Sequence, residues 1–472
     1  MSRPHVRTPH RAGHGGSSRR PSTVDPVRLV AYDVVHAVTT RDAYANLALA
    51  AALRERGLGG RDAAFATELA NGTLRRRGTY DRVLGRCVNR KLRDLDPEVL
   101  DVLRLGAHQV LGMRVPPHAA VATSVDLARR VAGVGASKLV NAVLRKVAAR
   151  DLPGWLAEFA PDYEADPLSH LGAVHSHPRW IVAAFRDALG GSLEETAALL
   201  AADNEPARVA VAAWPGRSTV DELQAAGARP GLWSPYAAIL DEGDPHRIPA
   251  VAAGRAGVQD EGSQLVALAL AHAELDGPDS TWLDLCAGPG GKAALLAGLA
   301  AQRSARLLAV ERQPHRAALV ARNLRGGAGV LATVVADGTV PPWRGGRFDR
   351  VLVDVPCTGL GALRRRPEAR WRREPADVRA LRPLQLGLLE SALDAVRPGG
   401  VVAYVTCSPH LAETRDIVAT VLAGRAEVER IDARPLLPGV PDLGDGPDVQ
   451  LWPHRHGTDA MYLALLRRTS RQ

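Results

Sequence analysis

The stretch LDLCAGPGGKAALLA, residues 283–297, reads as a strand, a glycine-rich turn and a helix. The glycines of the turn let the backbone bend sharply and approach a ligand closely. A phosphate-binding P-loop is excluded, because Cys286 stands where that motif requires its first glycine and Ala293 where it requires serine or threonine. The stretch therefore predicts the first strand, ligand loop and first helix of an α/β domain.

Strand-like runs alternate with helical segments from the strand of this stretch onward. The runs are TWLDLCA (281–287), ARLLAVE (305–311), VLATVVAD (330–337), FDRVLVDVP (348–356) and GGVVAYVTC (399–407). Continuous apolar strands separated by helices are typical of a parallel sheet that is covered on both faces. Two later runs, AEVERIDA (426–433) and DAMYLALLRR (459–468), are expected to form an antiparallel hairpin at one edge. We predict a Rossmann-like domain over residues 256–472 with a mostly parallel, seven-stranded sheet.

Two of these strands end on an acidic residue. Glu311 closes the second run, twenty residues past Gly291, where a carboxylate can accept hydrogen bonds from ribose hydroxyls. Asp337 closes the third run and can contact the adenine side of a nucleoside. The positions predict a nucleoside cofactor, but they do not separate NAD from S-adenosylmethionine.

Two cysteines lie at the ends of the next two strands. Cys357 follows the fourth run and Cys407 ends the fifth. Ligands bind beyond the carboxyl ends of parallel strands, and neighbouring strands are ~4.8 Å apart, so both thiols should face the cofactor. A thiolate that adds to C6 of cytosine makes C5 able to attack a methyl sulfonium, and this reaction also needs an acid near N3 and N4 and help with product release. Asp354 and the two cysteines supply these groups, and their spacing leaves open which cysteine attacks.

The composition of the chain indicates which partners, metals and cellular compartment to expect for this chemistry. The chain has 472 residues and a formal charge of +9, almost all of it from arginine, which suits a polyanionic partner such as nucleic acid. The four cysteines include no C-x-x-C pair, and neither H-x-H pair has acidic or cysteine neighbours, so no metal site and no disulfide are predicted. No apolar run is long enough to span a bilayer, and no signal-peptide core is visible, so we expect a cytoplasmic protein without a membrane partner.

The N-terminal half is organised differently. Residues 1–25 are basic and rich in Gly, Pro and Ser, which predicts a disordered tail. Residues 26–150 have helical periodicity, with Asp96 before Pro97 as one expected helix start and Ser137 as another. Residues 151–255 mix helical segments with the strand-like ARVAVAAW and are expected to form a small α+β linker domain.

Several motifs together resemble the Sun/Fmu family of RNA (cytosine-5) methyltransferases. They are VQDEGSQL (258–265), LDLCAGPGGK (283–292), VDVPCTGLGALRRRPEARWR (353–372) and YVTCSPH (404–410). The segments NGTLRRRGTYDRVL (71–84) and SKLVNAVLRKV (137–147) are similar to the antitermination factor NusB, and the combination most resembles bacterial methyltransferases of small-subunit ribosomal RNA. The resemblance covers roughly residues 27–467.

The resemblance implies a reaction and a set of residues. S-adenosylmethionine would be the methyl donor, Cys407 would attack C6, Cys357 would assist product release, and Asp354 would lie against cofactor and base. The implied cofactor contacts are Cys286, Ala287, Gly288, Pro289, Gly290, Gly291, Lys292, Glu311, Asp337 and Asp354. The chain departs from the usual C-A-A-P-G-G-K and D-A-P-C-S motifs at Gly288, Val355 and Thr358, and none of these changes removes a reacting group.

The segment after Cys357 is strongly basic. Residues 361–373 contain six arginines and a tryptophan, a mixture suited to phosphate contacts and base stacking. The predicted RNA-binding residues are Arg364, Arg365, Arg366, Arg370, Trp371 and Arg372. We expect a monomer that methylates 16S ribosomal RNA at cytosine C5, with the target cytosine flipped out of its stack. The same chemistry on tRNA or another RNA, a non-catalytic RNA-binding assembly factor and, least favoured, a nicotinamide dehydrogenase remain as alternatives.

Overall fold

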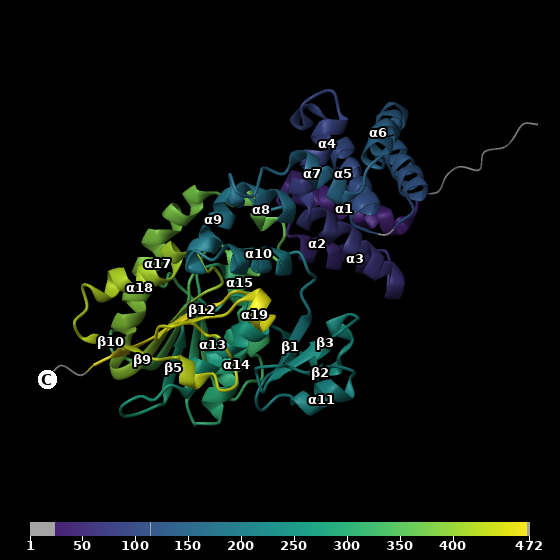
Figure 1. Ribbon diagram of the computed structural model, residues 1–472. Helices are drawn as coiled ribbons and strands as arrows, with labels where there is room; N and C mark the ends of the chain where they lie inside the picture. The colour runs from purple at the N-terminus through teal and green to yellow at the C-terminus, as the bar shows by residue number, and fades with distance from the viewer. Residues whose placement is uncertain (1–23, 114, 470–472) are drawn as a thin grey trace, which may run out of the picture.

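The computed structural model describes residues 24–113 and 115–469, and the predicted tail lies outside this range except for its last two residues. Figure 1 shows a helical N-terminal part, a small sheet in the middle of the chain and a larger C-terminal sheet with flanking helices. No helix in the described ranges is both long enough and apolar enough to cross a membrane.

The N-terminal part is a helical bundle around one apolar core. Its helices are α1 (Pro26–Arg41), α2 (Ala45–Glu55), α3 (Gly60–Arg75), α4 (Arg77–Cys87), α5 (Pro97–Leu111), α6 (Pro117–Val147) and α7 (Leu152–Phe159), with a 3-10 turn, η1, at Leu92–Asp94. Trp155 and Phe159 of α7 pack into the same core as α1, α3 and α5, so the helical core extends beyond residue 150.

Two predicted helix starts have different outcomes. Asp96 does occupy the N-cap position of α5, although its side chain makes no capping hydrogen bond. Ser137 is not a cap, because α6 has already resumed after a kink at Gly133, where φ is 89°. The hydroxyl of Ser137 instead donates to the carbonyl of Val134 within the helix. The prediction of a new helix at Ser137 is therefore wrong.

The middle of the chain consists of three helices followed by a small antiparallel sheet, with three further helical segments between the strands of that sheet. Its helices are α8 (Pro167–His175), α9 (Arg179–Ala188), α10 (Leu193–Ala202), α11 (Val220–Ala225), α12 (Pro249–Ala252) and η2 (Pro245–Arg247). Its strands are β1 (Val209–Ala213), β2 (Arg229–Pro230), β3 (Ala237–Leu240) and β4 (Ala256–Val258), in the order β2-β3-β1-β4. Helices α8 to α10 share an apolar core with Leu363 and Trp452, so the middle segment is packed onto the C-terminal domain.

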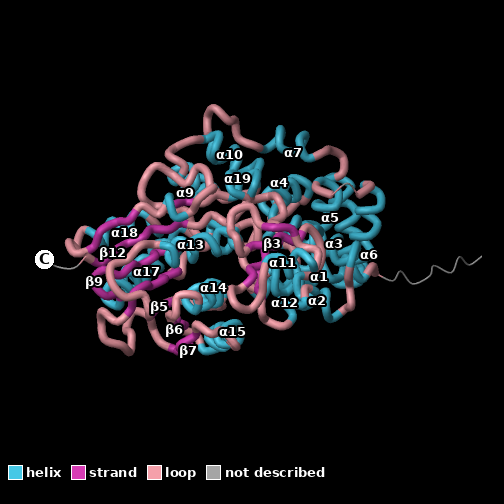
Figure 2. Tube along the Cα trace, turned by 90° about the horizontal axis from the view of Figure 1, so that it is seen from below, coloured by secondary structure: helices cyan, strands magenta, loops and turns pink. Residues whose placement is uncertain are grey.

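The C-terminal domain contains the predicted sheet. Its strands are β5 (Thr281–Asp284), β6 (Arg306–Glu311), β7 (Val330–Val335), β8 (Phe348–Asp354), β9 (Val396–Thr406), β10 (Val428–Ile431), β11 (Val449–Gln450) and β12 (Tyr462–Arg468). The order is β10-β12-β9-β8-β5-β6-β7, with the two-residue β11 added on β12. The pairs from β7 to β9 are parallel, and those of β12 with β9 and β10 are antiparallel. Figure 2 shows these strands following one another from β12 to β7.

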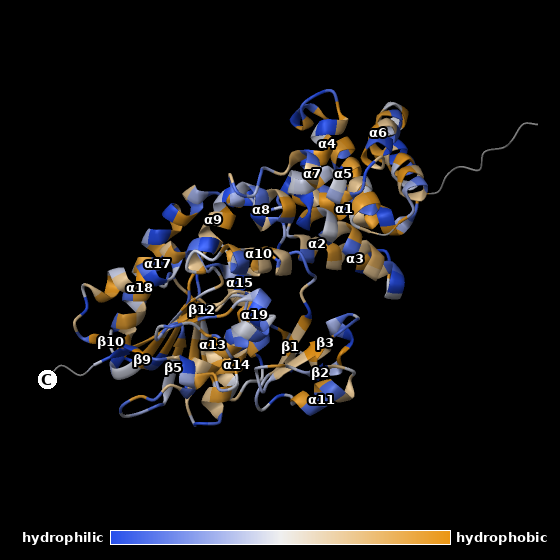
Figure 3. Cartoon of the chain, viewed as in Figure 1, coloured by the Kyte–Doolittle hydropathy of each residue, from blue (hydrophilic) through white to orange (hydrophobic). Residues whose placement is uncertain are grey.

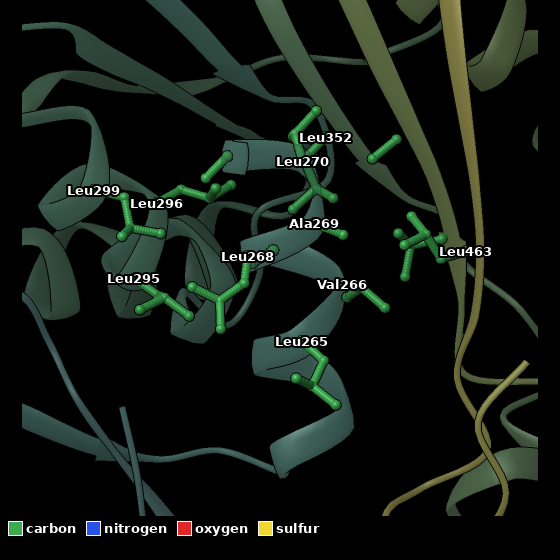
Figure 4. Packing of buried hydrophobic residues seen from close by; sticks show 14 of the residues in the cluster. Leu265, Val266, Leu268, Ala269, Leu270, Leu295, Leu296, Leu299, Leu352 and Leu463 are labelled. Carbon is green, nitrogen blue, oxygen red and sulfur yellow. The ribbon is translucent and has the colours of Figure 1, made fainter. Parts of the chain in front are cut away.

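Helices cover both faces of this sheet. Helices α13 (Glu261–His272), α14 (Gly291–Ala301) and α15 (Pro314–Leu324) lie on one face, and α17 (Pro375–Ala395) and α18 (Arg415–Leu422) lie on the other. The short helices α16 (Ala369–Arg372) and α19 (Pro453–His456) and the turns η3 (Leu360–Ala362), η4 (Leu411–Glu413) and η5 (Arg434–Leu436) lie in the connections. Alternate residues of β9 point to opposite faces: Val401 and Ala403 pack with α13 and α14, and Val402 and Tyr404 pack with α17 and α18. Figure 4 shows the leucines of α13 and α14 in the first of these layers, and Figure 3 shows the strands as the apolar centre.

The order of the strands fixes where a ligand binds. The connections run from β5 outward to β6 and β7 and then return across β5 to β8 and β9, so the winding reverses between β5 and β8. A crevice forms beyond the carboxyl ends of the strands at such a reversal. The predicted site residues follow those ends.

Candidate active site

The glycine-rich turn joins β5 to α14 in the predicted way. Gly290 caps α14 with a φ of 109°, a conformation that side chains other than glycine rarely adopt. A Cβ atom there would lie 3.0 Å from the Cα atom of Val320 in α15. The turn therefore requires glycine at this position for both conformation and space, and it leaves the first N–H groups of α14 available to a ligand.

Glu311 and Asp337 lie at the carboxyl ends of the next two strands. Glu311 is buried, and its Oε1 accepts the N–H of Gln313 at 2.9 Å. Asp337 follows β7, and hydrogen bonds from the N–H and hydroxyl of Thr339 hold the pKa of its carboxyl below the usual value. Both side chains are thus held by local hydrogen bonds at the edge where a nucleoside was expected.

The change from alanine to Gly288 has a structural explanation. Arg316 donates from Nη2 to the carbonyl of Gly288 at 2.6 Å, and its Nε lies 3.5 Å from Oε2 of Glu311. A Cβ atom at residue 288 would lie 2.0 Å from that Oε2 and 2.8 Å from the Nε. Gly288 therefore makes room for the Glu311–Arg316 pair directly beside the loop.

Asp284 is a site residue that the sequence reasoning missed. It ends β5 immediately before the loop and is only 1% exposed, and neither carboxylate oxygen has a hydrogen-bond partner within the described residues. Burial, with a further contribution from the charge of Asp354, raises the pKa of Asp284 to about 7. Its place at the end of a buried strand, four residues before the first glycine of the loop, was the available signal. A buried carboxylate without a protein partner suits a cationic group of a ligand.

Replacing Asp284 with asparagine should change how stability depends on pH. The folded-state pKa lies above the unfolded value near 4, so the wild-type protein without ligand loses stability as pH rises from about 4 to about 7. Asparagine removes this loss, and we expect Asp284→Asn to be more stable than wild type at pH 8 by about 1–3 kcal/mol but no more stable near pH 4. Thermal unfolding of both proteins across this range measures the difference. Parallel pH profiles would show that Asp284 is already ionised at no cost.

The two cysteines lie next to each other. Strands β8 and β9 are parallel neighbours, and the loops that follow them bring the Sγ atoms of Cys357 and Cys407 to 3.5 Å from each other. Both thiols are free and partly exposed. Beside them, Nζ of Lys292 donates to Oδ2 of Asp354 at 2.9 Å. The structure thus gathers four of the predicted residues from three separate loops.

The electrostatic environment distinguishes the two thiols. The hydrogen bond with Cys357 lowers the pKa of Cys407, and the positive charges of Lys292 and Arg366 act in the same direction. The same hydrogen bond raises the pKa of Cys357 well above its ordinary value, and burial adds to this. Cys407 is therefore the thiol favoured as thiolate, and Cys357 is its proton-bearing partner.

A buried carboxylate supports the Cys357 loop. Glu413 in η4 is fully buried, and its Oε1 accepts the N–H of Thr358 at 2.8 Å and the amide of Gln385 at 3.1 Å. The hydroxyl of Thr358 also donates to Glu413 and lies 3.2 Å from the hydroxyl of Ser408, the neighbour of Cys407. The sequence offered no signal for this role, because Glu413 lies in an ordinary acidic turn. It fixes one cysteine loop against the other.

The arginine-rich segment is mainly a structural connection. Arg370 is fully buried, and its guanidinium donates to the carbonyls of Arg75 and Asp203 and to the side chain of Asn204. Its prediction as an RNA contact is wrong, because no surface of its side chain is accessible.

Most of the other predicted RNA-binding residues of this segment also make contacts within the protein. Arg364 donates to the carbonyl of Gly457, Arg365 pairs with Asp260 and Asp459, and Arg372 donates to the carbonyls of Val38 and Ala43. The ring of Trp371 packs against Gly78 of the helical part. Arg366 alone among the six is exposed.

Within residues 24–113 and 115–469, no three His, Cys, Asp or Glu side chains gather closely enough to hold a metal ion.

Comparison with protein families divides the chain in the same way as the fold. Residues 270–467 match the model of the 16S rRNA methyltransferase RsmB/F family, and residues 25–149 match the NusB family. The first match contains the sheet, the glycine loop and both cysteines. The second contains helices α1 to α6. The predicted resemblance to Sun/Fmu methyltransferases with a NusB-like domain is confirmed.

Similar proteins extend over almost the whole chain. A putative methyltransferase of Mycobacterium tuberculosis, MT1451, is 56% identical over 96% of this chain and 98% of its own length. The ribosomal RNA small subunit methyltransferase B of Pseudomonas syringae is 30% identical over 94% of this chain and 97% of its own length. The crystal structure of PH0851 has the same fold, with a TM-score of 0.77, 22% identity and coverage of 95% and 100% of the two chains. The chain therefore belongs to the RsmB/F family of S-adenosylmethionine-dependent RNA methyltransferases and has a NusB-family domain at its N-terminal end.

Proposed function

We propose that this enzyme methylates C5 of a cytosine in 16S ribosomal RNA through a covalent bond between Cys407 and C6 of the base. The observation that carries the proposal is the pair of thiols 3.5 Å apart, with Cys407 beside the Lys292–Asp354 ion pair. Relatives named ribosomal RNA small subunit methyltransferase B support the choice of RNA.

The cofactor site suits S-adenosylmethionine. Asp284 offers a buried carboxylate without a protein partner, which fits a ligand that carries an ammonium group. We assign the loop from Cys286 to Lys292 to the backbone contacts, Glu311 to the ribose and Asp337 to the adenine side. When bound, the cofactor supplies the methyl group that C5 of the base receives.

The first step belongs to Cys407. Its thiolate forms a bond to C6, and the electron pair of the C5–C6 double bond becomes available at C5. Asp354 and Lys292 are the polar side chains beside the thiols, and we assign them to the N3 and N4 edge of the cytosine. Lys292 also lies in the glycine loop, so the same ion pair joins the cofactor site to the base.

The last step belongs to Cys357. The hydrogen bond to Cys407 is the main cause that raises the pKa of Cys357, and the negative charge of Cys407 adds to it. Once Cys407 is bonded to carbon that charge is gone, so Cys357 becomes easier to ionise. It loses its own proton to solvent, and the resulting thiolate accepts the C5 proton. Loss of this proton returns an electron pair to the C5–C6 bond, and the bond from C6 to sulfur breaks to release the Cys407 thiolate.

Transfer of labelled methyl groups to unmodified 16S ribosomal RNA tests this function. We expect label in 5-methylcytosine at one or a few positions, and none in tRNA included in the same reaction. Label in tRNA alone would keep the chemistry and replace the substrate. Binding of RNA without any label would instead favour the non-catalytic assembly factor.

A further inference from the structure

The helical domain and the methyltransferase domain meet along a seam beside the active-site loops. The connection between α1 and α2, residues 42–44, and the first residue of α2 lie against residues 366–372. Nη2 of Arg372 donates to the carbonyl of Ala43 at 2.7 Å, and the N–H of Ala45 lies 3.4 Å from Oε1 of Glu368. Ala45 and Glu368 are buried, so the seam is closed at its centre.

An aromatic ring and an arginine remain at the surface of this seam. Tyr44 is 50% exposed, although it lies between residues held by the other domain. The guanidinium carbon of Arg366 lies over its ring, 5.3 Å from the ring centroid. The Arg366 side chain is exposed, and within residues 24–113 and 115–469 it forms neither an ion pair nor a hydrogen bond. Leu47, the third residue of α2, is also an exposed apolar side chain of this part of the helical domain, at 64%.

This pair is close to the reacting groups. Arg366 follows Cys357 by nine residues, and the chain between them is fixed where the N–H of Gly361 donates to the carbonyl of Cys407 at 2.8 Å. The positive charge of Arg366 also acts on the thiol of Cys407, where it favours the thiolate. The aromatic surface of the helical domain therefore borders the segment that follows Cys357.

We propose that Tyr44 and Arg366 form a composite RNA-contacting surface, in which a base near the target cytosine stacks on Tyr44 and its phosphate pairs with Arg366. This inference rests on the proposed function for the nature of the polymer. It assigns to the NusB-family domain a contact made together with the methyltransferase domain, so that one stretch of RNA touches both.

The chemistry of the pair favours RNA over an apolar protein partner. An exposed aromatic ring offers a stacking face to any base, and an arginine beside it supplies both a phosphate ligand and a planar stacking group. A protein partner would bury Arg366 without a compensating charge from this chain. A target base that leaves its stack also exposes its neighbours, and these need a new stacking surface close to the active site.

The test measures RNA affinity and methyl transfer separately. Filter binding of unmodified 16S ribosomal RNA should give a dissociation constant about tenfold higher for Tyr44→Ala, the scale of one lost base–aromatic stack. Tyr44→Phe should bind as wild type. Arg366→Ala removes one phosphate contact, so the slope of log affinity against log salt concentration should become less steep by about one. The double variant should lose less RNA affinity than the product of the two single losses, because both side chains contact the same nucleotide.

Two controls separate this inference from the proposed function. Tyr163→Ala and Arg325→Ala remove an exposed tyrosine and an exposed arginine outside the seam and should leave RNA affinity unchanged. If Tyr44→Ala and Arg366→Ala bind RNA as tightly as wild type while wild type forms 5-methylcytosine, the composite surface is refuted and the proposed function stands. If wild type forms no 5-methylcytosine but both variants lose RNA affinity, the surface stands and the proposed reaction fails.

Discussion

Cys407→Ser should abolish methyl transfer, with a loss of at least about a thousandfold in rate. Serine keeps the size of the side chain, but its hydroxyl does not ionise near neutral pH, so no nucleophile remains for C6. The environment that lowers the pKa of Cys407, formed by Cys357, Lys292 and Arg366, has little effect on an alcohol. Cofactor binding should be unchanged, because the substitution leaves the glycine loop and the acidic residues intact.

Cys357→Ser should behave in the opposite way. Addition of Cys407 to the base and methyl transfer should still occur, but the C5 proton would have no thiolate to accept it, so the protein should remain attached to RNA. A band that survives denaturing electrophoresis and disappears on RNase treatment would measure this adduct. Cys87→Ala, which changes a buried cysteine of the helical domain, is the matched control and should turn over normally.

The opposite behaviour of the two variants would reassign the two cysteines. An adduct that accumulates with Cys407→Ser, together with an inert Cys357→Ser, would exchange the two roles. It would also show that the electrostatic asymmetry between the thiols does not decide which one attacks.

The strand ends were predictable from sequence because the sheet is parallel and its strands are apolar. Once the runs before Glu311, Asp354 and Cys407 are read as strands, their carboxyl ends must lie at one edge, and the side chains that follow them converge. No long-range information is needed for this step. Asp284 obeys the same rule and was missed because the glycines beside it already accounted for the loop.

The arginine-rich segment could not be interpreted in the same way. A run of arginines looks alike in sequence whether its side chains face solvent or backbone carbonyls from other domains. The acceptors of Arg370 belong to Arg75, Asp203 and Asn204, which are between 166 and 295 residues away in the chain. Only Arg366 retains the exposure that the RNA prediction assumed, and its aromatic partner, Tyr44, comes from the other end of the chain.

Arg370→Ala should therefore affect stability far more than a surface arginine does. The substitution leaves three buried acceptors without a donor, and hydrogen bonds from a charged group contribute about 1.5–3 kcal/mol each. After local relaxation we expect a loss of about 3–5 kcal/mol in the free energy of unfolding. Arg366→Ala, a few residues away and exposed, should cost less than about 0.5 kcal/mol and is the control.

The loss of stability in Arg370→Ala should appear first as separation of the helical domain from the methyltransferase domain. Arg370 joins the methyltransferase domain to the end of α3 and to the residues after α10, so its removal should allow the helical domain to melt independently, and calorimetry should resolve two transitions in place of one.

The pH dependence of the free energy of unfolding should change as well. Burial already raises the pKa of Asp203 to about 7 against the opposing charge of Arg370, so the variant should hold this proton to higher pH. A carboxyl with a raised folded-state pKa costs stability as pH rises, and in Arg370→Ala this loss should therefore continue above pH 7. A single transition at the wild-type temperature would show that the other contacts of the seam hold the domains together without Arg370.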